Sequence, residues 1–535
     1  METLGRVTLT LTVILVIDFL RRLIRARLTF YKLKKQELPM PSWNPVLGHL
    51  QKLDESLKRL PKGCQATELF SLMSHDFPDT SRSFYADCWP FGNPLLVINS
   101  PELAIQVCQE HDLPKPPILI PFFKPFAGDG NLFVVNGKEW RHSRSLFNPG
   151  FSAAAMLEHM PHIITEAEAY VEKLQYHAKK GDTFSLDEIT CDYMMDVIGV
   201  VTLNSHLKFQ NGYNALASAM RSSLRWHCLP EEPNLFVRWN PIRPIVQAYN
   251  GYKMNRYIST ELDKRYEEWK SGKATDRAKS VIDIVIADYM SQRQAAEGLD
   301  AEFKHWAITA IRLFLFAGHD STAATIAYSC YLLSKHPDKL SKLRDEHSEV
   351  FGTDLSAATE ILKQHPQSIN ELPYTTAIIK EVLRLFPPAS GMRGGLPNVY
   401  LHDKYGNKFP TENLNVWVNH SALHRNPEYW PEPHSFIPER WLAKPGDPLY
   451  PPKRGWRPFE YGPRNCIGQS LAMLDIKITL VMTARRFDFK DKYAELDSSR
   501  PLRGISTVYG ERAYQITQGA AHPADGLPCQ VTLRG

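Results

Sequence analysis

The stretch Phe459-Glu-Tyr-Gly-Pro-Arg-Asn-Cys-Ile-Gly468 is the most informative part of this sequence. It places Cys466 on a short loop between two glycines, directly before the apolar segment Gln469-Ser-Leu-Ala-Met-Leu474. Backbone N–H groups in a tight loop and at a following helix N-terminus stabilise a thiolate, and Gly462 and Gly468 let the backbone approach closely. The pattern therefore favours a thiolate that is presented to a metal as its single protein ligand.

A small buried cysteine in a Gly/Pro turn is the alternative, since free cysteines often behave as hydrophobic residues. Coincidence is a poor explanation, however, because the pattern Phe-x-x-Gly-x-Arg-x-Cys-x-Gly is matched at all its fixed positions. The stretch resembles the haem-binding signature of the cytochrome P450 superfamily, in its membrane-bound eukaryotic type. The resemblance implies haem b with Cys466 as its axial thiolate ligand, which favours O–O cleavage. It also implies cofactor contacts for Phe459, Gly462, Arg464 and Gly468, where Arg464 suits a propionate carboxylate.

The bulk properties favour one large domain. The chain has 535 residues, of which 43% are hydrophobic, and no Gly/Ser linker, charged block or repeat interrupts it after residue 46. We therefore expect a single haem-thiolate catalytic domain at 46–535. A net charge of +5 does not favour nucleic acid as a partner. The eight cysteines form no Cys-x-x-Cys pair, which argues against a zinc ribbon, a disulfide scaffold and covalent c-type haem and suits a reducing compartment.

The N-terminus is apolar from Val7 to Leu20, and several arginines and lysines follow. No small-x-small cleavage site is present, so an uncleaved membrane anchor at 1–22 is predicted, with a cleaved signal peptide as the alternative. The basic residues would keep the catalytic body on the cytosolic side. Residues 23–45 are predicted to form a basic, Pro-rich hinge. The resemblance to membrane-bound P450s implies a single-pass protein of the endoplasmic reticulum.

Helical periodicity dominates after residue 101, and strand-like runs are few. This predicts a mainly α fold with a small β part (α+β), and the resemblance implies the cytochrome P450 fold. The predicted helices are Ala155–Ala178, Tyr249–Lys270, Val281–Ala295, Phe303–Ser334 and Tyr374–Phe386, and the predicted strands are Leu95–Asn99 and Asn413–Asn419.

The longest predicted helix contains Phe316-Ala-Gly-His-Asp-Ser-Thr322. A glycine costs about 1 kcal/mol in a helix, so we expect a locally loosened helix in which small residues leave room for a flat ligand. A kinked core helix with Asp320 in solvent is the alternative. The segment is similar to the P450 oxygen-activation motif, Ala-Gly-x-Asp-Thr-Thr. The similarity implies that Asp320 supplies protons together with an alcohol. Ser321 replaces the usual threonine and Thr322 follows, so either hydroxyl is a candidate.

Glu381-Val-Leu-Arg384 places opposite charges three residues apart on one helical face. On a surface such a pair contributes only about 0.2–0.5 kcal/mol. A further arginine, Arg440, lies in Phe436-Ile-Pro-Glu-Arg-Trp441. These segments resemble the Glu-x-x-Arg helix and the Pro-Glu-Arg segment of P450s. The resemblance implies that Glu381, Arg384 and Arg440 form a buried, structural charge network behind the cysteine loop.

Trp140 and Arg144 are spaced four residues apart and therefore share one helix face. A simple cation–π pair between them is the alternative to a functional role. The resemblance implies that both residues bind haem propionates. Arg393 is a further propionate candidate, for which a solvent-facing loop charge is the alternative.

The resemblance implies a monooxygenase that inserts one atom of dioxygen into a lipophilic molecule. The chain lacks a strand-borne Gly-x-Gly-x-x-Gly fingerprint, so electrons must come from another protein. NADPH-cytochrome P450 reductase is the expected donor and cytochrome b5 a further candidate. Lys453, Arg454 and Arg457 offer a basic docking face, although a solvated loop explains them equally well. The rival functions are a haem-thiolate isomerase or dehydratase and a non-catalytic haem-binding sensor; the acid and hydroxyls of the helix motif favour the monooxygenase.

The segments Pro116–Asn131 and Ser205–Tyr249 are predicted to line the substrate pocket, with ordinary packing as the alternative. Their aromatic and apolar content favours a bulky lipophilic substrate. The sequence is similar to fungal P450s of secondary metabolism or of alkane and fatty-acid oxidation. A polyketide, terpenoid, alkaloid or fatty acid all fit this description.

Overall fold

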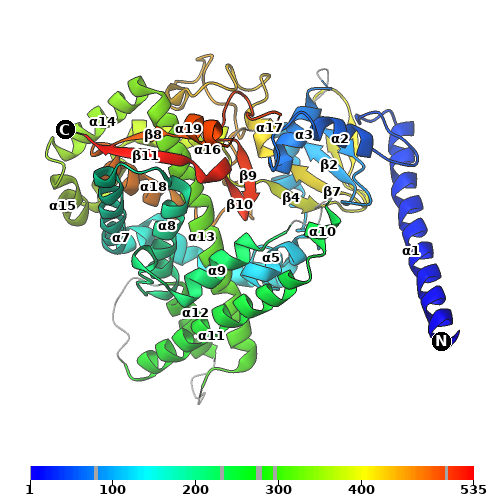
Figure 1. Cartoon of the computed structure of the whole chain (residues 1–535), viewed down its shortest axis with the longest axis horizontal. Helices are drawn as coiled ribbons and strands as arrows, with labels where there is room; N and C mark the ends of the chain where they lie inside the picture. The colour runs from blue at the N-terminus through cyan, green and yellow to red at the C-terminus, as the bar shows by residue number, and fades with distance from the viewer. Residues whose placement is uncertain are drawn as a thin grey trace.

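The computed structural model describes residues 2–77, 82–228, 234–272, 280–292, 298–500 and 504–534. Helices form most of this part of the chain, and the strands are short (Figure 1). The helices are α1 (Glu2–Lys35), α2 (Leu50–Leu57), α3 (Ala66–Ser74), α4 (Pro101–Ile105), α5 (Leu119–Ala127), α6 (Gly137–Phe147), α7 (Ala153–Lys180), α8 (Leu186–Leu203), α9 (Ala215–Arg225), α10 (Leu235–Arg238), α11 (Ile242–Lys270), α12 (Val281–Gln292), α13 (Ala301–Lys335), α14 (Pro337–Phe351), α15 (Ala357–Gln364), α16 (Pro373–Leu385), α17 (His420–His424), α18 (Gln469–Thr483) and α19 (Tyr493–Ser499).

The strands form small sheets. A four-stranded sheet has the order β1 (Phe84–Ala86), β2 (Leu95–Ile98), β7 (Asn415–Val418) and β4 (Gly391–Gly394). Strands β2 and β7 are parallel, with Leu95 opposite Asn415, and the other pairs are antiparallel. The smaller sheets are β3 (Phe184–Ser185), β11 (Pro528–Leu533) and β8 (Phe487–Asp491); β9 (Gln515–Gln518) and β10 (Ala520–Pro523); and β5 (Tyr400–His402) and β6 (Lys408–Pro410).

The predicted mainly α fold with a small β part is confirmed. All five predicted helices are present as α7, α11, α12, α13 and α16, and the two predicted strands contain β2 and β7. The bounds differ by a few residues, and the predicted end of α12 at Ala295 lies outside the described residues. In α12 the buried residues recur with helical spacing on one face, which is the signal that periodicity detects. Helix α13 is buried on nearly all sides and was found by its length.

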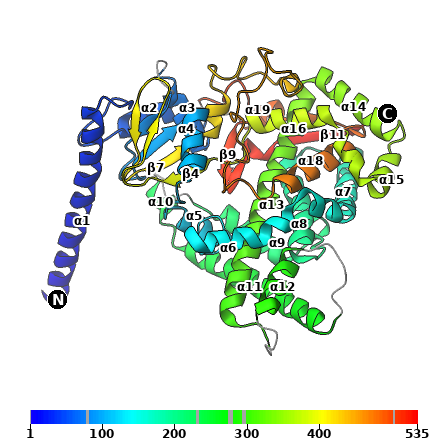
Figure 2. The same cartoon turned by 180° about the vertical axis from the view of Figure 1, so that it is seen from behind.

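Helix α13 runs through the middle of the molecule and packs along α8, with α16, α18 and β10 also against it (Figures 1 and 2). Its start is fixed by Asp300, whose side chain accepts a hydrogen bond from the N–H of Phe303 at 2.8 Å. The predicted loosening at Gly318 is wrong, because the helix is regular from Ala301 to Lys335. A Cβ at Gly318 would lie 2.4 Å from Cδ1 of Ile198 in α8. The glycine therefore permits close packing of two helices.

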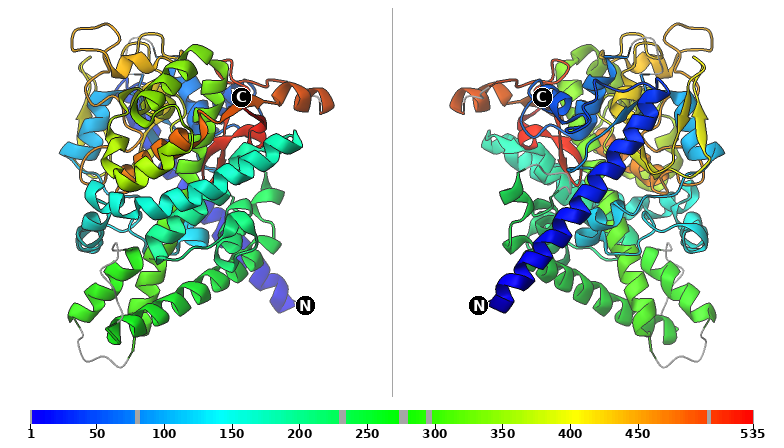
Figure 3. Two further views of the ribbon diagram at one scale, coloured as in Figure 1. Left: turned by 90° about the vertical axis from the view of Figure 1, so that its left-hand side faces the viewer. Right: turned by 90° about the vertical axis from the view of Figure 1, so that its right-hand side faces the viewer.

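Helix α1 projects away from the body of the molecule (Figure 3). Its last turns are nevertheless attached to the body, since Phe30 and Leu33 are buried in one apolar cluster with Leu96 of β2. Arg27 Nη1 also lies 2.5 Å from Oδ2 of Asp87, in a buried ion pair. The predicted hinge at 23–45 is therefore wrong in its first part, which is helix docked on the sheet.

The anchor predicted at 1–22 is not supported. Within the described residues, no helix is both long enough and apolar enough to cross a membrane. The apolar run at the start of α1 is interrupted by Asp18, which pairs with Arg22 at 2.7 Å.

Candidate active site

The cysteine loop leads directly into α18. The N–H of Cys466 donates to the carbonyl oxygen of Phe459 at 2.8 Å, which closes the loop. Gly462 has a φ of 90°, and a Cβ there would lie 2.3 Å from the carbonyl oxygen of Cys108. Only glycine therefore allows the loop to lie against this neighbouring segment, as the spacing of the motif predicted.

The thiol of Cys466 is exposed and lines a cavity of about 390 Å³, together with Arg144, Phe151 and Met473. Desolvation of the sulfur by the surrounding protein raises the pKa of the Cys466 thiol. The N–H of Gly468 and the charge of Arg144 act to lower this pKa. The predicted backbone stabilisation of a thiolate is thus present but does not outweigh desolvation. A metal ion on the sulfur would remove the proton outright.

Arg144 holds the residue that precedes the cysteine. Its Nη1 donates to the carbonyl oxygen of Asn465 and its Nη2 to Oδ1 of the same residue, both at 2.7 Å. Trp140 lies on the same helix, α6, but it stacks with Arg464, whose guanidinium lies 4.4 Å from the ring centroid. The alternative cation–π pair between Trp140 and Arg144 is therefore not what the structure shows. Their predicted contacts with propionates stay predictions.

A cluster of three cations, Lys115, Arg393 and Arg464, lies beside the loop. Burial and then the charge of Arg393 lower the pKa of Lys115, with Arg464 adding to the effect. Arg464 donates to Oδ1 of Asn136 at 2.8 Å, and this side chain in turn donates to the carbonyl of Lys115 at 3.0 Å. Like charges held this closely indicate a site for an anion.

Arg393 is buried in β4, with only 1% of its surface exposed, so the alternative of a solvent-facing charge is wrong. Its Nη1 donates to the carbonyl of Leu113 at 3.2 Å. Its Nε has no hydrogen-bond partner within the described part of the chain. A buried donor without a partner costs about 1–3 kcal/mol unless a ligand accepts from it.

Lys115 was missed by the sequence analysis. It lies between Pro114 and Pro116, directly before the segment Pro116–Asn131 that was predicted to line the pocket. Nothing local marks such a lysine as buried. The neighbouring prolines, of which Pro116 restricts the backbone of Lys115 to an extended conformation, were the available signal.

The two hydroxyl residues of the α13 motif, Ser321 and Thr322, lie on different faces of the helix. Ala317 is exposed, while the adjacent Phe316 and the nearby His319 are buried. Ser321 lies one turn further on the face of Ala317, and its Oγ donates to the carbonyl of Ala317 at 2.9 Å. Thr322 is buried on the packed side. Of the two candidate alcohols, only Ser321 shares the open face of the helix.

Asp320 is buried, so the alternative that places it in solvent is wrong. Its Oδ2 accepts a hydrogen bond from the N–H of Ala520 at 2.5 Å, and its Oδ1 lies 3.1 Å from Nε2 of His522. Burial alone would raise the pKa of Asp320, but His522 and the hydrogen bonds lower it below its usual value. The carboxylate is therefore ionised and held toward the β9–β10 hairpin.

The predicted charge network is present. Arg384 donates to both oxygens of Glu381, at 2.8 and 2.9 Å, and Arg440 donates to Oε1 at 3.0 Å. The three side chains are completely buried. Trp441 Nε1 adds a further hydrogen bond to Glu381 at 3.0 Å. The structure thus brings together residues that are about 60 positions apart in sequence.

Two hydrogen bonds connect this network to Arg457, two residues before the cysteine loop. Arg384 donates to the carbonyl of His424 at 2.9 Å, and Nε2 of His424 accepts from the N–H of Arg457 at 2.9 Å. Arg457 itself is completely buried and pairs with Glu460. It therefore cannot belong to the predicted basic docking face, of which only Lys453 and Arg454 are exposed.

Comparisons with known proteins agree with this geometry. A family model described as Cytochrome P450 matches residues 39–515. The chain belongs to the cytochrome P450 family. Cytochrome P450 monooxygenase polC of Polytolypa hystricis is 39% identical over 528 residues, or 98% of this chain and 94% of that protein. Cytochrome P450 monooxygenase acrF of Aspergillus aculeatus is 32% identical, over 84% of this chain and 93% of that protein.

Among solved structures, the crystal structure of the cytochrome P450DA heme domain is similar over 93% of this chain and 98% of that chain, with a TM-score of 0.71. The sequence identity is only 19%, so this similarity shows the P450 fold. Together with the relatives, it establishes a P450 monooxygenase.

P450 enzymes use haem b with a cysteine thiolate ligand, which in this sequence is Cys466, and take electrons from NADPH through a reductase. The residues fit this cofactor. The thiol is exposed, the cation cluster suits the propionates, and Nε of Arg393 is a buried donor that lacks an acceptor. When bound, haem supplies O–O cleavage and the oxidising chemistry. Arg144 positions the cysteine loop through Asn465, and Lys115, Arg393 and Arg464 would hold the haem carboxylates.

The pKa of Lys115 is lowered to about 7, whereas a bound propionate would favour the charged lysine. Above pH 7, haem binding should therefore take up a proton, and haem affinity should fall as pH rises, by up to about tenfold per pH unit. Transfer of haem to excess apomyoglobin at several pH values measures this. Lys115→Arg stays charged throughout and should flatten the dependence. Equal slopes for the two proteins would contradict the role of Lys115.

Proposed function

We propose that this P450 oxidises a lipophilic small molecule of fungal secondary metabolism, using dioxygen and electrons from an NADPH-cytochrome P450 reductase, with cytochrome b5 as a second donor. The observation that carries the proposal is the combination of an accessible thiol at Cys466 with an acid and a hydroxyl, Asp320 and Ser321, adjacent on α13. An isomerase or dehydratase would need no proton supply of this kind. The same combination disfavours a sensor without turnover.

We assign the alcohol role to Ser321, because it shares the open face of Ala317. Asp320 supplies protons from the adjacent position. Thr322 packs inside the helix bundle and is not part of this pair. The role of the protein in dioxygen activation is to deliver protons at defined atoms, the carboxyl group of Asp320 and the hydroxyl of Ser321.

An aromatic cluster supports a lipophilic substrate. Phe126 in α5 lies 4.4 Å, centroid to centroid, from Phe316 in α13, directly before the exposed Ala317. Phe122 lies 4.7 Å from His227, which joins the segment Pro116–Asn131 to Ser205–Tyr249. The two segments thus contact each other, and the first also contacts α13 at the residue before Ala317. The apolar surface fits a polyketide, terpenoid, alkaloid or fatty acid, and a spin-state titration of ferric haem with such compounds would identify the class.

We further propose that the enzyme works at the endoplasmic reticulum membrane with its catalytic body in the cytosol. Helix α1 exposes apolar residues between Val7 and Leu20, and the basic residues that follow would face anionic lipid headgroups. Exposed Lys453 and Arg454 beside the cysteine loop would meet an acidic reductase surface.

One experiment tests both proposals. The full chain is produced in a eukaryotic host, and microsomes and cytosol are assayed separately with isotopically labelled dioxygen and a substrate selected by the spin-state titration. We expect product in microsomes only, with one labelled oxygen atom, and none without NADPH or reductase. Equal turnover of a hydroperoxide without reductase would establish the isomerase instead. An enzyme recovered fully in cytosol would contradict the membrane location.

A further inference from the structure

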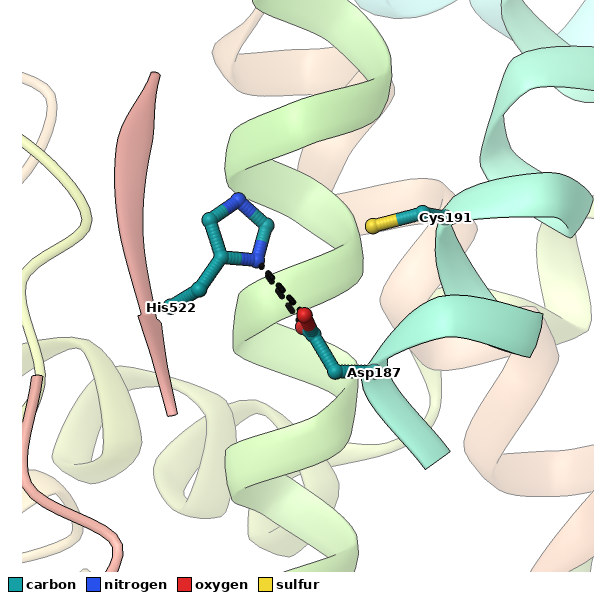
Figure 4. Close-up of side chains that lie close together, drawn as sticks. All are labelled: Asp187, Cys191 and His522. Atoms are coloured by element: carbon teal, nitrogen blue, oxygen red, sulfur yellow. Dashed lines mark hydrogen bonds and ion pairs between the residues drawn. The ribbon is translucent and has the colours of Figure 1, made fainter. Parts of the chain in front are cut away.

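His522 lies between two carboxylates that belong to different helices. Its Nδ1 is 2.9 Å from Oδ1 of Asp187 at the start of α8, and its Nε2 is 3.1 Å from Oδ1 of Asp320 in α13. We call Asp187, His522 and Asp320 the His522 triad. Its members are almost fully buried, with exposed side-chain fractions of 9%, 3% and 4%, respectively. Figure 4 shows Asp187 and His522 facing each other, with Cys191 beside them.

The ring of His522 is placed to carry a positive charge. A neutral imidazole has one donor and one acceptor nitrogen. Here Nδ1 is hydrogen-bonded to Asp187, and Nε2 lies 3.1 Å from Oδ1 of Asp320 in an ion pair without hydrogen-bond geometry. A ring that carries both protons therefore has a carboxylate oxygen close to each of them. Burial would lower the pKa of His522, but the two carboxylates together raise it well above its usual value. His319 on α13, Cys191 and Glu188 on α8, and Arg221 on α9 are the other titratable groups nearby.

A metal site is the competing interpretation, because donor atoms of Asp187, Cys191 and His522 all lie within 4.8 Å of one another. The geometry argues against it. Tetrahedral zinc with bonds of about 2.1 Å holds its ligand atoms about 3.4 Å apart, whereas Nδ1 of His522 and Oδ1 of Asp187 are at hydrogen-bonding distance, 2.9 Å. Burial and both carboxylates also raise the pKa of Cys191, so its thiol stays protonated.

The hairpin between β9 and β10 fixes the carboxylate of Asp320. Oδ2 accepts from the N–H of Ala520, and a Cβ at the preceding Gly519, which has a φ of 100°, would lie 2.5 Å from this oxygen. Glycine is therefore required for the hairpin to approach. One carboxylate oxygen thus accepts from the backbone, and the other faces Nε2 of His522 at 3.1 Å. Ser321 is the next residue on the helix.

We propose that His522, held by Asp187, is a positioning residue that stores the proton passed to Asp320 during turnover. In this step the Nε2–H bond breaks and an O–H bond forms on Oδ1 of Asp320, which leaves a neutral imidazole and a neutral acid. No net charge enters the core, because the proton is already there. Asp320 then gives its proton to the oxygen being reduced, by way of the Ser321 hydroxyl, and becomes a carboxylate again. A proton from the medium later returns to Nε2 and restores the imidazolium. This inference rests on the proposed proton-delivery role of Asp320 and Ser321.

The test uses His522→Gln in the haem-loaded enzyme, since glutamine keeps a donor but cannot store the proton. We expect a normal carbon monoxide spectrum and an unchanged substrate-induced spin shift. The fraction of NADPH converted to product should fall several-fold, with the remainder lost as hydrogen peroxide, and the solvent isotope effect should increase. Asp187→Asn removes one carboxylate from His522 and should show the same change to a smaller extent.

Tyr328→Phe is the matched control. Tyr328 donates to the carbonyl of Ala513 at 2.9 Å and so attaches the segment before β9 to α13 without touching the His522 triad. This variant should convert the same fraction of NADPH to product as the wild type does. Normal coupling in His522→Gln would overturn the proposal. Loss of coupling in both variants, in proportion to their melting temperatures, would do so too, because the triad would then be a structural clamp.

A second readout does not depend on turnover. Histidine-selective NMR labelling should show one imidazolium in the wild type at about pH 8, well above the usual histidine pKa of about 6.5, and this signal should be absent in His522→Gln. If no charged histidine is found, the proposal is wrong even for an active enzyme. If it is found but the wild type forms no product, the proposed function fails instead. Stoichiometric zinc in the purified protein would establish the metal site in place of the proton store.

Discussion

Cys466→Ser is expected to abolish the thiolate-type carbon monoxide spectrum and all product formation above background. A serine hydroxyl is not deprotonated at neutral pH and cannot donate electron density to iron as a thiolate does. The backbone of the loop should be unaffected, because the N–H of residue 466 still donates to the carbonyl of Phe459. Absorbance of the reduced protein under carbon monoxide measures the result.

Cys64→Ser is the matched control for this substitution. Cys64 pairs through its backbone with Ile516 and lies outside the cysteine loop. Its spectrum and activity should equal those of the wild type. A thiolate-type spectrum that persists in Cys466→Ser would contradict the assignment of Cys466 as the iron ligand, whatever the activity of the control.

Glu381→Gln is expected to destabilise the protein by about 3–5 kcal/mol and to yield little haem-loaded enzyme. Burial would raise the pKa of Glu381, but Arg384 and Arg440 lower it, so the carboxylate is ionised. Its removal leaves two buried guanidinium groups without a counter-charge. Since a domain is stable by only about 5–15 kcal/mol, the loss is a large fraction of the total. Denaturant unfolding and haem content per chain measure it.

Glu439→Gln provides the comparison, because Glu439 lies only two residues from Ile437, whose N–H donates to Glu381. Its carboxylate is partly exposed and pairs with Lys339 and Lys342 at 2.9 and 2.8 Å. Surface pairs contribute about 0–1 kcal/mol, so this variant should retain its haem. Equal losses for the two glutamates would show that burial of the network has no special effect.

Local patterns in the sequence were sufficient for the fold class and for Cys466. The cysteine motif and the long helical segments depend on residues close together in the chain, where spacing reports geometry directly. The charge network was also found, because its members lie in two recognisable motifs. The bounds of the first helix were not found, since docking of Phe30 and Leu33 on a sheet formed by distant strands decides them.

The sequence by itself determined the thiolate ligand, the cation Arg464 beside it and the acid and hydroxyls of α13. Only the tertiary structure decided which of these groups are buried, and against what. It placed Lys115 and Arg393 beside the loop, removed Arg457 from the surface and joined Asp320 to His522, which is about 200 residues away. The reason is physical: burial and the partner at the other end of a long-range contact set the charge and orientation of an ionisable group, and spacing along the chain carries no record of either.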